Sequence, residues 1–203
     1  MVRRHPAAFR DAYSPRVVNN IYLDSPGLGE YYAHVNGAPN RCKTRVRWYG
    51  EFAGEACEPA LERKLKYGSV SGKNALRLPP LRMNGEPARA VLQSWFERAK
   101  LPEVLRLALH HLEPTLFNHY FRHYFVSGDG RFRMTLDSDL RFASPQTVFA
   151  AAPAFFFERP RLVLELKFPP EHAEGAERIT NFFPFRLARC SKYVMGIETV
   201  GGR

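Results

Sequence analysis

Polar and apolar positions alternate along much of the chain, which predicts a protein built largely from strands. In residues 40–50, "NRCKTRVRWYG", every second position carries a cation: Arg41, Lys43, Arg45 and Arg47. Side chains two residues apart share a face of a β-strand, so this segment predicts a strand with one basic face and one mostly apolar face. Further strands are predicted at 16–25, 60–68, 116–127, 131–140, 161–168 and 186–198.

Helices are predicted between these strands. The opening, as far as Tyr13, predicts a short helix that runs into Ser14-Pro15. Apolar residues at helical intervals predict further helices at 86–100, 102–112 and 171–183. The turn Gly128-Asp129-Gly130 between two strand segments indicates a β-hairpin. Mostly antiparallel strands with helices segregated between them predict an α+β fold.

The charged faces of the predicted strands carry mainly cations, with a few carboxylates among them. Arg133 shares a predicted face with Asp137 and Asp139, and Glu165 shares one with Lys167. A solvated sheet explains any one such strand, but the repetition favours a sheet curled into a barrel with its charged faces inside. A lumen of unpaired cations is too costly unless it is wet and holds an anion of high charge density. The carboxylates could then supply oxygen ligands for Mg²⁺ or Mn²⁺.

Composition agrees with a globular protein that has an anionic partner. The 203 residues include 30 Lys+Arg and 20 Asp+Glu, a formal charge of +10, which favours nucleic acid, an acidic membrane surface or a phosphorylated compound. The three cysteines show no CxxC spacing, which argues against a zinc site or disulfide framework and favours a reducing compartment. The longest apolar run, 149–157, is too short to span a bilayer, and no signal peptide is recognisable. We therefore expect a cytoplasmic protein with no membrane segment.

Six motifs occur in order along the chain: "PRVVNNIYLDSP", "RCKTRVRWYG", "LERKLKYG", "YFRHYFVSGDGRFRMTLDSDL", "LVLELKF" and "CSKYVMG". This ordered set resembles the vacuolar transporter chaperone (VTC) domain, a family of triphosphate tunnel metalloenzymes. The resemblance implies one tunnel domain over residues 1–203, an antiparallel β-barrel with a charged lumen and flanking helices. It also implies that the lumen binds polyphosphate, tripolyphosphate or ATP with Mn²⁺ or Mg²⁺. Because eukaryotic members polymerise polyphosphate from ATP, the implied reaction is phosphoryl transfer of the polyphosphate polymerase type.

Site residues are implied motif by motif. Glu165 matches the metal-binding glutamate and, with Lys192, is a candidate catalytic residue. The implied substrate-binding residues are Arg45, Arg47, Lys64, Arg77, Tyr120, Arg122, Arg133, Arg189, Ser191 and Lys192. Lys43, Lys66 and Lys73 lie beside these positions and are weaker candidates.

One departure from the family leaves alternatives open. Members of the family begin with a strand of the "RxExK" kind followed by a helix, whereas this sequence starts at "RRHPAAFRDAY" and the first strand is apparently missing. A non-catalytic polyphosphate-binding module is therefore an alternative to an enzyme. A basic sheet that binds nucleic acid is a further alternative, since its Tyr, Phe and Trp residues could stack on bases. Carboxylates on the same faces would repel a nucleic-acid backbone, so neither DNA nor RNA is expected as a partner.

Overall fold

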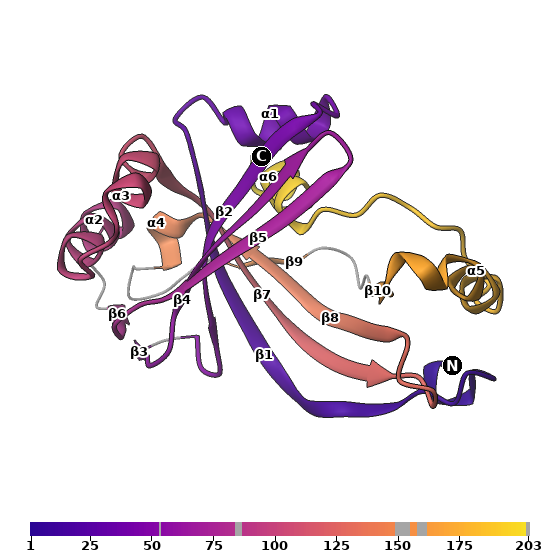
Figure 1. Cartoon of the computed structure of the whole chain (residues 1–203). Coiled ribbons are helices and arrows are strands. Elements are labelled where there is room, and N and C mark those ends of the chain that lie inside the picture. Colours follow the sequence, from indigo (N-terminus) through magenta and orange to yellow (C-terminus); the bar gives the residue numbers. More distant parts are fainter. Residues whose placement is uncertain (53, 84–86, 149–154, 158–161, 202–203) are drawn as a thin grey trace.

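A curled antiparallel sheet dominates the structure. The computed structural model describes residues 1–203 except 53, 84–86, 149–154, 158–161 and 202–203. The strands of the sheet are β1 (Arg10–Asp24), β2 (Asn40–Tyr49), β4 (Ala60–Tyr67), β5 (Val70–Arg77), β7 (Glu113–Val126), β8 (Arg133–Ala143), β9 (Phe156–Phe157) and β10 (Val163–Lys167). Their order is β10-β8-β7-β1-β2-β4-β5, with β9 paired to β8. The sheet forms an open half-barrel whose edges, in the described residues, are β5 and β10 (Figure 1).

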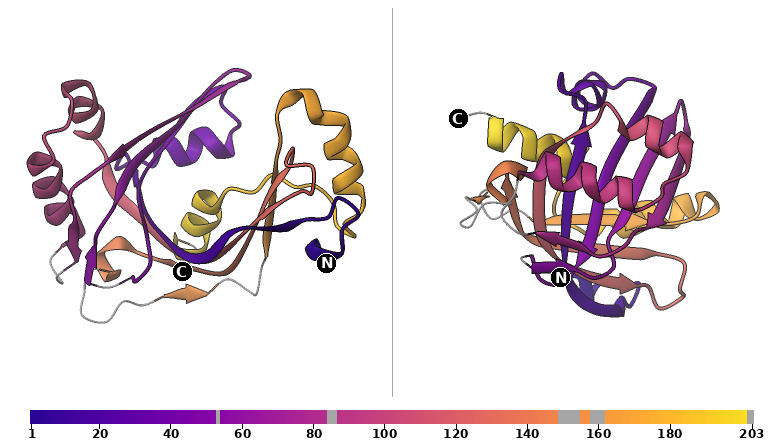
Figure 2. Two further views of the ribbon diagram at one scale, coloured as in Figure 1. Left: turned by 60° about the horizontal axis from the view of Figure 1, so that its bottom comes forward. Right: turned by 90° about the vertical axis from the view of Figure 1, so that its left-hand side faces the viewer.

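Helices lie on both sides of this sheet. They are α1 (Gly29–Val35), α2 (Ala88–Arg98), α3 (Glu103–Leu109), α4 (Pro145–Val148), α5 (Ala173–Asn181) and α6 (Lys192–Gly201), with 3-10 turns at Val2–Arg4 and Pro170–His172 and a small sheet of β3 (Gly54–Ala56) and β6 (Leu81–Met83). Figures 1 and 2 show α1 and α6 on the concave side and α2 and α3 on the convex side. The predicted α+β fold, a barrel-like antiparallel sheet with flanking helices, is thus confirmed as an open half-barrel. No helix in the described ranges is long and apolar enough to cross a membrane, and most of the apolar run at 149–157 lies outside those ranges.

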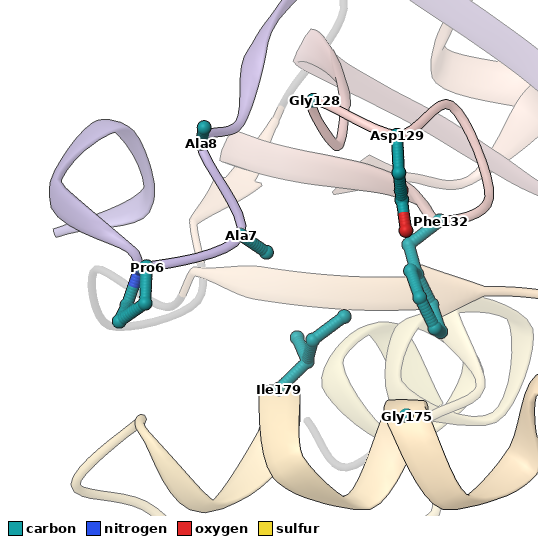
Figure 3. A pocket seen from close by; sticks show the side chains of 8 residues that line it. All are labelled: Pro6, Ala7, Ala8, Gly128, Asp129, Phe132, Gly175 and Ile179. Atoms are coloured by element: carbon teal, nitrogen blue, oxygen red, sulfur yellow. The ribbon is translucent and has the colours of Figure 1, made fainter.

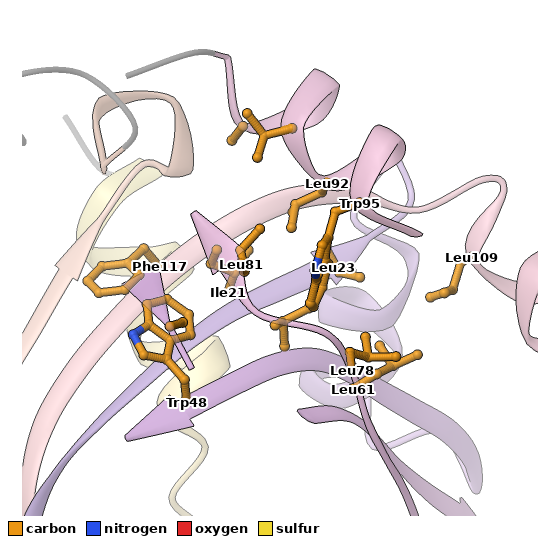
Figure 4. Packing of buried hydrophobic residues seen from close by; sticks show 14 of the residues in the cluster. Ile21, Leu23, Trp48, Leu61, Leu78, Leu81, Leu92, Trp95, Leu109 and Phe117 are labelled. Atoms are coloured by element: carbon orange, nitrogen blue, oxygen red, sulfur yellow. The ribbon is translucent and has the colours of Figure 1, made fainter. Parts of the chain in front are cut away.

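Large apolar side chains pack between the convex face of the sheet and helix α2. Ile21, Trp48 and Phe117 from the central strands belong to one cluster with Leu92 and Trp95 of α2 (Figure 4). Each of the five is at most 2% exposed. Burial of such a side chain stabilises the fold by roughly 1.5–3 kcal/mol, so this cluster anchors the outer face of the sheet.

Two further clusters attach α5 and α6 to opposite faces. Phe125 and Met134, on the apolar face of the β7–β8 hairpin, belong to a buried cluster with Ile179 of α5. On the charged face, the ring of Tyr22 stacks on Tyr193 of α6 with centroids 4.9 Å apart. The predicted inversion, apolar side outward and charged side inward, therefore holds for the central strands.

The predicted N-terminal helix is wrong. Beyond the turn at Val2–Arg4, the chain enters β1 at Arg10 and pairs with β7 throughout. Pro15 misled the prediction because proline usually ends regular structure. Here it lies where β1 has a neighbour only on its β7 side, since pairing with β2 begins at Val18, and the register shifts between Tyr13 and Arg16 accommodate it.

The predicted last strand at 186–198 is also wrong, because its second half is helix α6. Helix α6 contributes Tyr193, Ile197 and Val200, together with Met195, to the cluster against the sheet, and Gly196 between them is buried. That spacing of three and four residues is the helical period, which a short apolar run does not distinguish from a strand.

A bulge in β8 changes the predicted direction of one side chain, that of Asp139. Asp139 has a φ of +53°, and the register between β7 and β8 shifts at this point. Asp139 consequently pairs with Arg141 through its Oδ2, 2.7 Å from Nη2, and does not share the charged face with Asp137. Leu140, the next residue, is buried in the cluster with Tyr193 on the concave side.

Asp24, at the end of β1, joins both concave-side helices to the sheet. Its carboxylate accepts hydrogen bonds from the backbone N–H groups of Glu30 and Tyr31 in α1, both at 2.9 Å. The hydroxyl of Tyr193 in α6 donates to Asp24 Oδ2 at 2.5 Å. An anion at the start of α1 is favourable for the helix dipole, and the same carboxylate fixes where α6 enters the half-barrel.

Helix α6 comes closest to the sheet at Gly196. A Cβ at this position would lie 2.4 Å from Leu116 Cδ2 and 2.6 Å from Phe142 Cδ1, and both side chains are fully buried. We expect Gly196→Ala to lower the free energy of unfolding by about 1–3 kcal/mol, because neither neighbour has room to move. Gly201→Ala in the same helix meets nothing within 4 Å and should be neutral or slightly stabilising. Urea unfolding of both variants measures this, and equal effects would contradict the close packing.

Candidate functional site

The strand residues predicted to bind phosphate share the concave face of the sheet. Strand pairing places Arg45 of β2 opposite Glu62 of β4 and Arg47 opposite Asn20 of β1. Arg122 of β7 pairs with Arg16 on one side and Asp137 on the other. The remaining strand candidates on this face are Lys64, Arg77, Tyr120, Arg133 and Glu165, together with the weaker candidates Lys43, Lys66 and Lys73.

Glu62 holds three of these cations. Its Oε2 accepts hydrogen bonds from Arg45 Nε at 2.9 Å and Nη2 at 2.7 Å, and lies 3.7 Å from Arg47 Nη1. Its Oε1 accepts a hydrogen bond from Lys73 Nζ at 2.5 Å. Burial acts to raise the pKa of Glu62, but Arg47 and Arg45 lower it to about 2. The carboxylate is therefore ionised across the physiological range.

Asp137 is the shared counter-ion of a second group of cations, Arg122 and Lys192. It is fully buried and accepts hydrogen bonds from Arg122 Nε at 2.5 Å and Nη2 at 2.7 Å. Lys192 Nζ, from the first residue of α6, lies 2.6 Å from Asp137 Oδ2. Burial acts to raise the pKa of Asp137, but the bonds from Arg122 and the charge of Lys192 hold it below its usual value. Both cations also lie over the Tyr120 ring, 5.2 and 5.1 Å from its centroid.

A buried polar bridge connects the two groups. Arg47 Nε donates to Asn20 Oδ1 at 2.8 Å, and its Nη2 donates to the Tyr120 hydroxyl at 3.1 Å. Asn20 Nδ2 donates to Asn118 Oδ1 at 2.7 Å. Because Arg47 is fixed by neutral oxygens as well as by Glu62, its guanidinium has one defined position between both carboxylates.

The loop before α6 closes one end of the charged face. Ser191 Oγ accepts a hydrogen bond from Lys43 Nζ at 2.9 Å, so a side chain of β2 contacts the start of α6. Burial lowers the pKa of Lys43 to about 8, and the neighbouring charge of Lys64 contributes. Arg189, in the same loop, is exposed. Lys43, which the sequence indicated only weakly, is thus in direct contact with a predicted site residue.

Not all predicted residues lie in the two carboxylate-centred groups. Arg77 and Lys64 are exposed on β5 and β4. Arg133 is exposed near the end of β8, opposite Val126 of β7. Glu165 lies on β10 beside Thr135, one step along the strands from the Asp137 position. These residues border the central array and do not contribute ion pairs to it in the described residues.

The carboxylates of this face do not form a protein-only metal cage. In the described part of the chain, no three His, Cys, Asp or Glu side chains are arranged to hold an ion. Glu62 and Asp137 are engaged by cations, whereas Glu165 is 42% exposed and its partner Lys167 is 3.6 Å away. Such a carboxylate fits Mg²⁺ or Mn²⁺, because Mg²⁺ is commonly held by one or two carboxylates, waters and substrate phosphates. Among Glu62, Asp137 and Glu165, it is Glu165 whose carboxylate is open to an ion.

A pocket elsewhere on the molecule has a different character. It lies between the N-terminal segment, the β7–β8 turn and α5, and Figure 3 shows its lining of Pro6, Ala7, Ala8, Gly128, Asp129, Phe132, Gly175 and Ile179. Asp129 is the one charged residue among these. A mainly apolar pocket with a carboxylate does not suit a phosphate ligand, so the concave face remains the candidate site.

Sequence reasoning did not include Glu62, Asp137, Asn20 and Asn118 among the site residues. The two carboxylates carried a usable signal, since both occupy charged-face positions among cations. The two asparagines carried none, because their partnership depends on the pairing of β1 with β7, which lie about 100 residues apart in the chain.

We expect Glu62→Gln to lower the free energy of unfolding by about 3–5 kcal/mol at pH 7, because Arg45 and Arg47 lose their buried counter-charge. Glu165→Gln is the matched control, since loss of an exposed pair costs about 0–1 kcal/mol.

The Glu62 pKa of about 2 lies below the usual value of an unfolded chain. Its stabilisation is therefore complete above about pH 4.5 and is lost as the pH falls toward 2. Urea unfolding between pH 6 and pH 3 should show the free energies of unfolding of the wild type and Glu62→Gln converging as the pH falls. A difference that stays constant with pH would contradict the lowered pKa of Glu62.

The chain has recognisable relatives. A similar fold is found in a solved structure described as the putative adenylyl cyclase HpAC1 from Hippeastrum, with a dominant triphosphatase activity. The two chains are 12% identical, with a TM-score of 0.57, over 94% of this chain and 85% of the other. No curated protein matches the sequence significantly. The VTC domain family matches residues 3–200, nearly the whole sequence, and the chain therefore belongs to the VTC domain family.

Proposed function

We propose that the concave face binds a linear chain of phosphates with a divalent cation. The ligand is inorganic polyphosphate, tripolyphosphate or the triphosphate of ATP. The main support is the imbalance of charge, since five cations surround the two buried carboxylates: Arg45, Arg47, Lys73, Arg122 and Lys192. A polyanion supplies the missing negative charge at several positions at once. Membership of the VTC domain family and the triphosphatase activity named for the structural relative support the same class of ligand.

The proposed reaction is metal-assisted phosphoryl transfer of the polyphosphate polymerase type. Positioning and charge neutralisation supply most of the catalysis in such transfers. Lys192, held beside Tyr120 by Asp137, would neutralise charge on the reacting phosphate, and Glu165 would hold Mn²⁺ or Mg²⁺. The other proposed phosphate-binding residues are Arg45, Arg47, Lys64, Arg77, Tyr120, Arg122, Arg133, Arg189 and Ser191. A non-catalytic polyphosphate-binding module is the second candidate, favoured by the position of Glu165 outside the two carboxylate-centred groups.

Two further expectations belong to the same proposal. Cys42, Cys57 and Cys190 are all free thiols, which suits the reducing cytoplasm. Nucleic acid is not a proposed partner, because Glu62 and Asp137 lie within the basic face and a phosphodiester backbone has a lower charge density than tripolyphosphate. A single-stranded oligonucleotide therefore serves as the comparison ligand in binding experiments.

We expect tripolyphosphate to bind more tightly than orthophosphate or the oligonucleotide, and added salt to weaken its binding. Arg45→Ala with Arg47→Ala should reduce tripolyphosphate affinity by at least tenfold, since both guanidinium groups lie in the proposed site. Arg3→Ala with Arg4→Ala removes the same charge from the exposed N-terminal turn and should change affinity little. Calorimetry measures affinity, and circular dichroism verifies that both variants are folded. Equal affinity for tripolyphosphate and orthophosphate would overturn the proposal.

Glu165→Gln tests the metal part of the proposal separately. The variant keeps the size of the side chain but lacks the charge that attracts a hard divalent ion. It should remain folded and bind tripolyphosphate through the cations, but lose the Mn²⁺-dependent part of binding or turnover. The measurement is a Mn²⁺ titration at fixed tripolyphosphate in wild type and variant. If the two respond alike, Glu165 does not hold the metal.

A further inference from the structure

A hydroxyl and an amine meet where the loop before α6 contacts the charged face. Ser191 belongs to this loop and Lys43 to β2, 148 residues apart in the chain, and Lys43 Nζ lies 2.9 Å from Ser191 Oγ. Both side chains are half-buried. A hydroxyl within hydrogen-bond reach of an amine is an arrangement that activates a weak oxygen nucleophile, provided that the amine can take up a proton.

Lys43 differs from Lys73 and Lys192 in having no counter-ion. Those two lysines each contact a carboxylate, whereas within the described part of the chain Lys43 makes no ion pair. Burial lowers the pKa of Lys43 to about 8, and the neighbouring charge of Lys64 acts in the same direction. Roughly a tenth of the Lys43 side chains are therefore neutral at pH 7, and a neutral amine can accept a proton.

Helix α6 fixes the position of the Ser191 hydroxyl. The carbonyl oxygen of Ser191 accepts a hydrogen bond from Met195 N at 2.9 Å, so Ser191 is the N-cap residue of α6. The backbone N of Val194 lies 3.4 Å from Ser191 Oγ. Oγ is thus held between the first turn of the helix and Lys43 Nζ. Negative charge added at Oγ would lie at the positive end of the helix dipole.

The pair also lies among cations of the proposed phosphate site. Lys192 directly follows Ser191, and Lys64 is the cross-strand partner of Lys43. Helix capping explains the serine, but it does not explain Lys43, because a half-buried ammonium without a counter-ion costs free energy. A reaction that needs a hydroxyl, a proton acceptor and nearby positive charge would use all of these features.

We propose that Ser191 accepts a phosphoryl group from the bound phosphate chain, with Lys43 as the base, and becomes phosphoserine. This inference rests on the proposed function and deepens it by naming a nucleophile. Neutral Lys43 Nζ takes the proton from Ser191 Oγ while Oγ forms a bond to the terminal phosphorus. The bond from that phosphorus to its bridging oxygen breaks, and the electron pair leaves with this oxygen. The products are phosphoserine, a Lys43 ammonium and a phosphate chain one unit shorter.

Acid-quenched reactions with tripolyphosphate and Mn²⁺ test the proposal, with mass spectrometry of the peptide that contains Ser191 as the readout. The wild type should gain one phosphoryl group at Ser191, and Ser191→Ala should gain none anywhere in the chain. Ser94→Ala is the matched control, because Ser94 Oγ also accepts a hydrogen bond from a cation, Arg98 Nη1 at 2.6 Å, but lies on α2 at the convex side. It should form phosphoserine at Ser191 as the wild type does.

Lys43→Arg separates proton transfer from attraction of the ligand. Arginine keeps the positive charge but does not give up its proton at neutral pH. The rate of phosphoserine formation should therefore fall by at least about tenfold more than the tripolyphosphate affinity does. Quenched time courses give the rate, calorimetry gives the affinity, and circular dichroism verifies folding. Equal falls in rate and affinity would overturn the role of Lys43 as the base.

The outcomes separate this inference from the proposed function. Phosphoserine at Ser191 in the wild type, together with its loss in Ser191→Ala, supports the inference. If the wild type binds tripolyphosphate but Ser191 stays unmodified, with or without turnover, the inference is overturned while the phosphate site stands. If the wild type does not bind tripolyphosphate, the proposed function itself fails, and this inference fails with it.

Discussion

The structure depends on pairing a concentrated set of cations with two buried carboxylates. Neighbouring cations on one strand face lie about 6.6 Å apart, where each repulsion is ~2.5 kcal/mol at an effective dielectric constant of 20. An attraction at about 4 Å under the same conditions is ~4 kcal/mol. Glu62 holds Arg45 and Lys73 and lies near Arg47, while Asp137 holds Arg122 and Lys192. Attraction therefore exceeds repulsion within each group, and the cations can share the concave face of one sheet.

This pairing also determines how the rest of the chain is arranged. With the cations on the concave side, the opposite face must be apolar and covered, and α2 covers it through Leu92 and Trp95. Helix α6 enters the concave side because Lys192 reaches Asp137 and Tyr193 reaches Asp24. Helix α6 thus carries both a packing contact, at Gly196, and a residue of the proposed site, Lys192. A change that displaces the helix at Gly196 would therefore also move Lys192.

Local alternation in the sequence predicted the charged face of the sheet. Contacts between residues far apart in the chain determine the ion-pair partners on that face and the elements that were predicted wrongly. The alternation that placed Arg45 and Arg47 together depends only on residues two apart in one strand, and it holds in the structure. Which carboxylate each cation meets depends on register between strands, which the sequence does not display. The same limit explains the wrong prediction at α6, whose direction depends on the surface it packs against, and at Asp139, whose positive φ follows from a bulge opposite β7. Which side chains share the charged face was therefore more predictable than which partners they meet there.

The internal carboxylates also bear on what the proposed site can recognise. A single phosphate would compete with Glu62 or Asp137 for cations that already have a hydrogen-bonded anion, and would gain little. A chain of phosphates can contact both groups at once through Arg47, which lies between them and is held by Asn20 and Tyr120. Each further phosphate adds a contact with a cation, while the entropy of bringing the ligand to the site is lost only once for the whole chain. In the proposed function, selectivity for several linked phosphates thus follows from the same ion pairs that stabilise the empty fold.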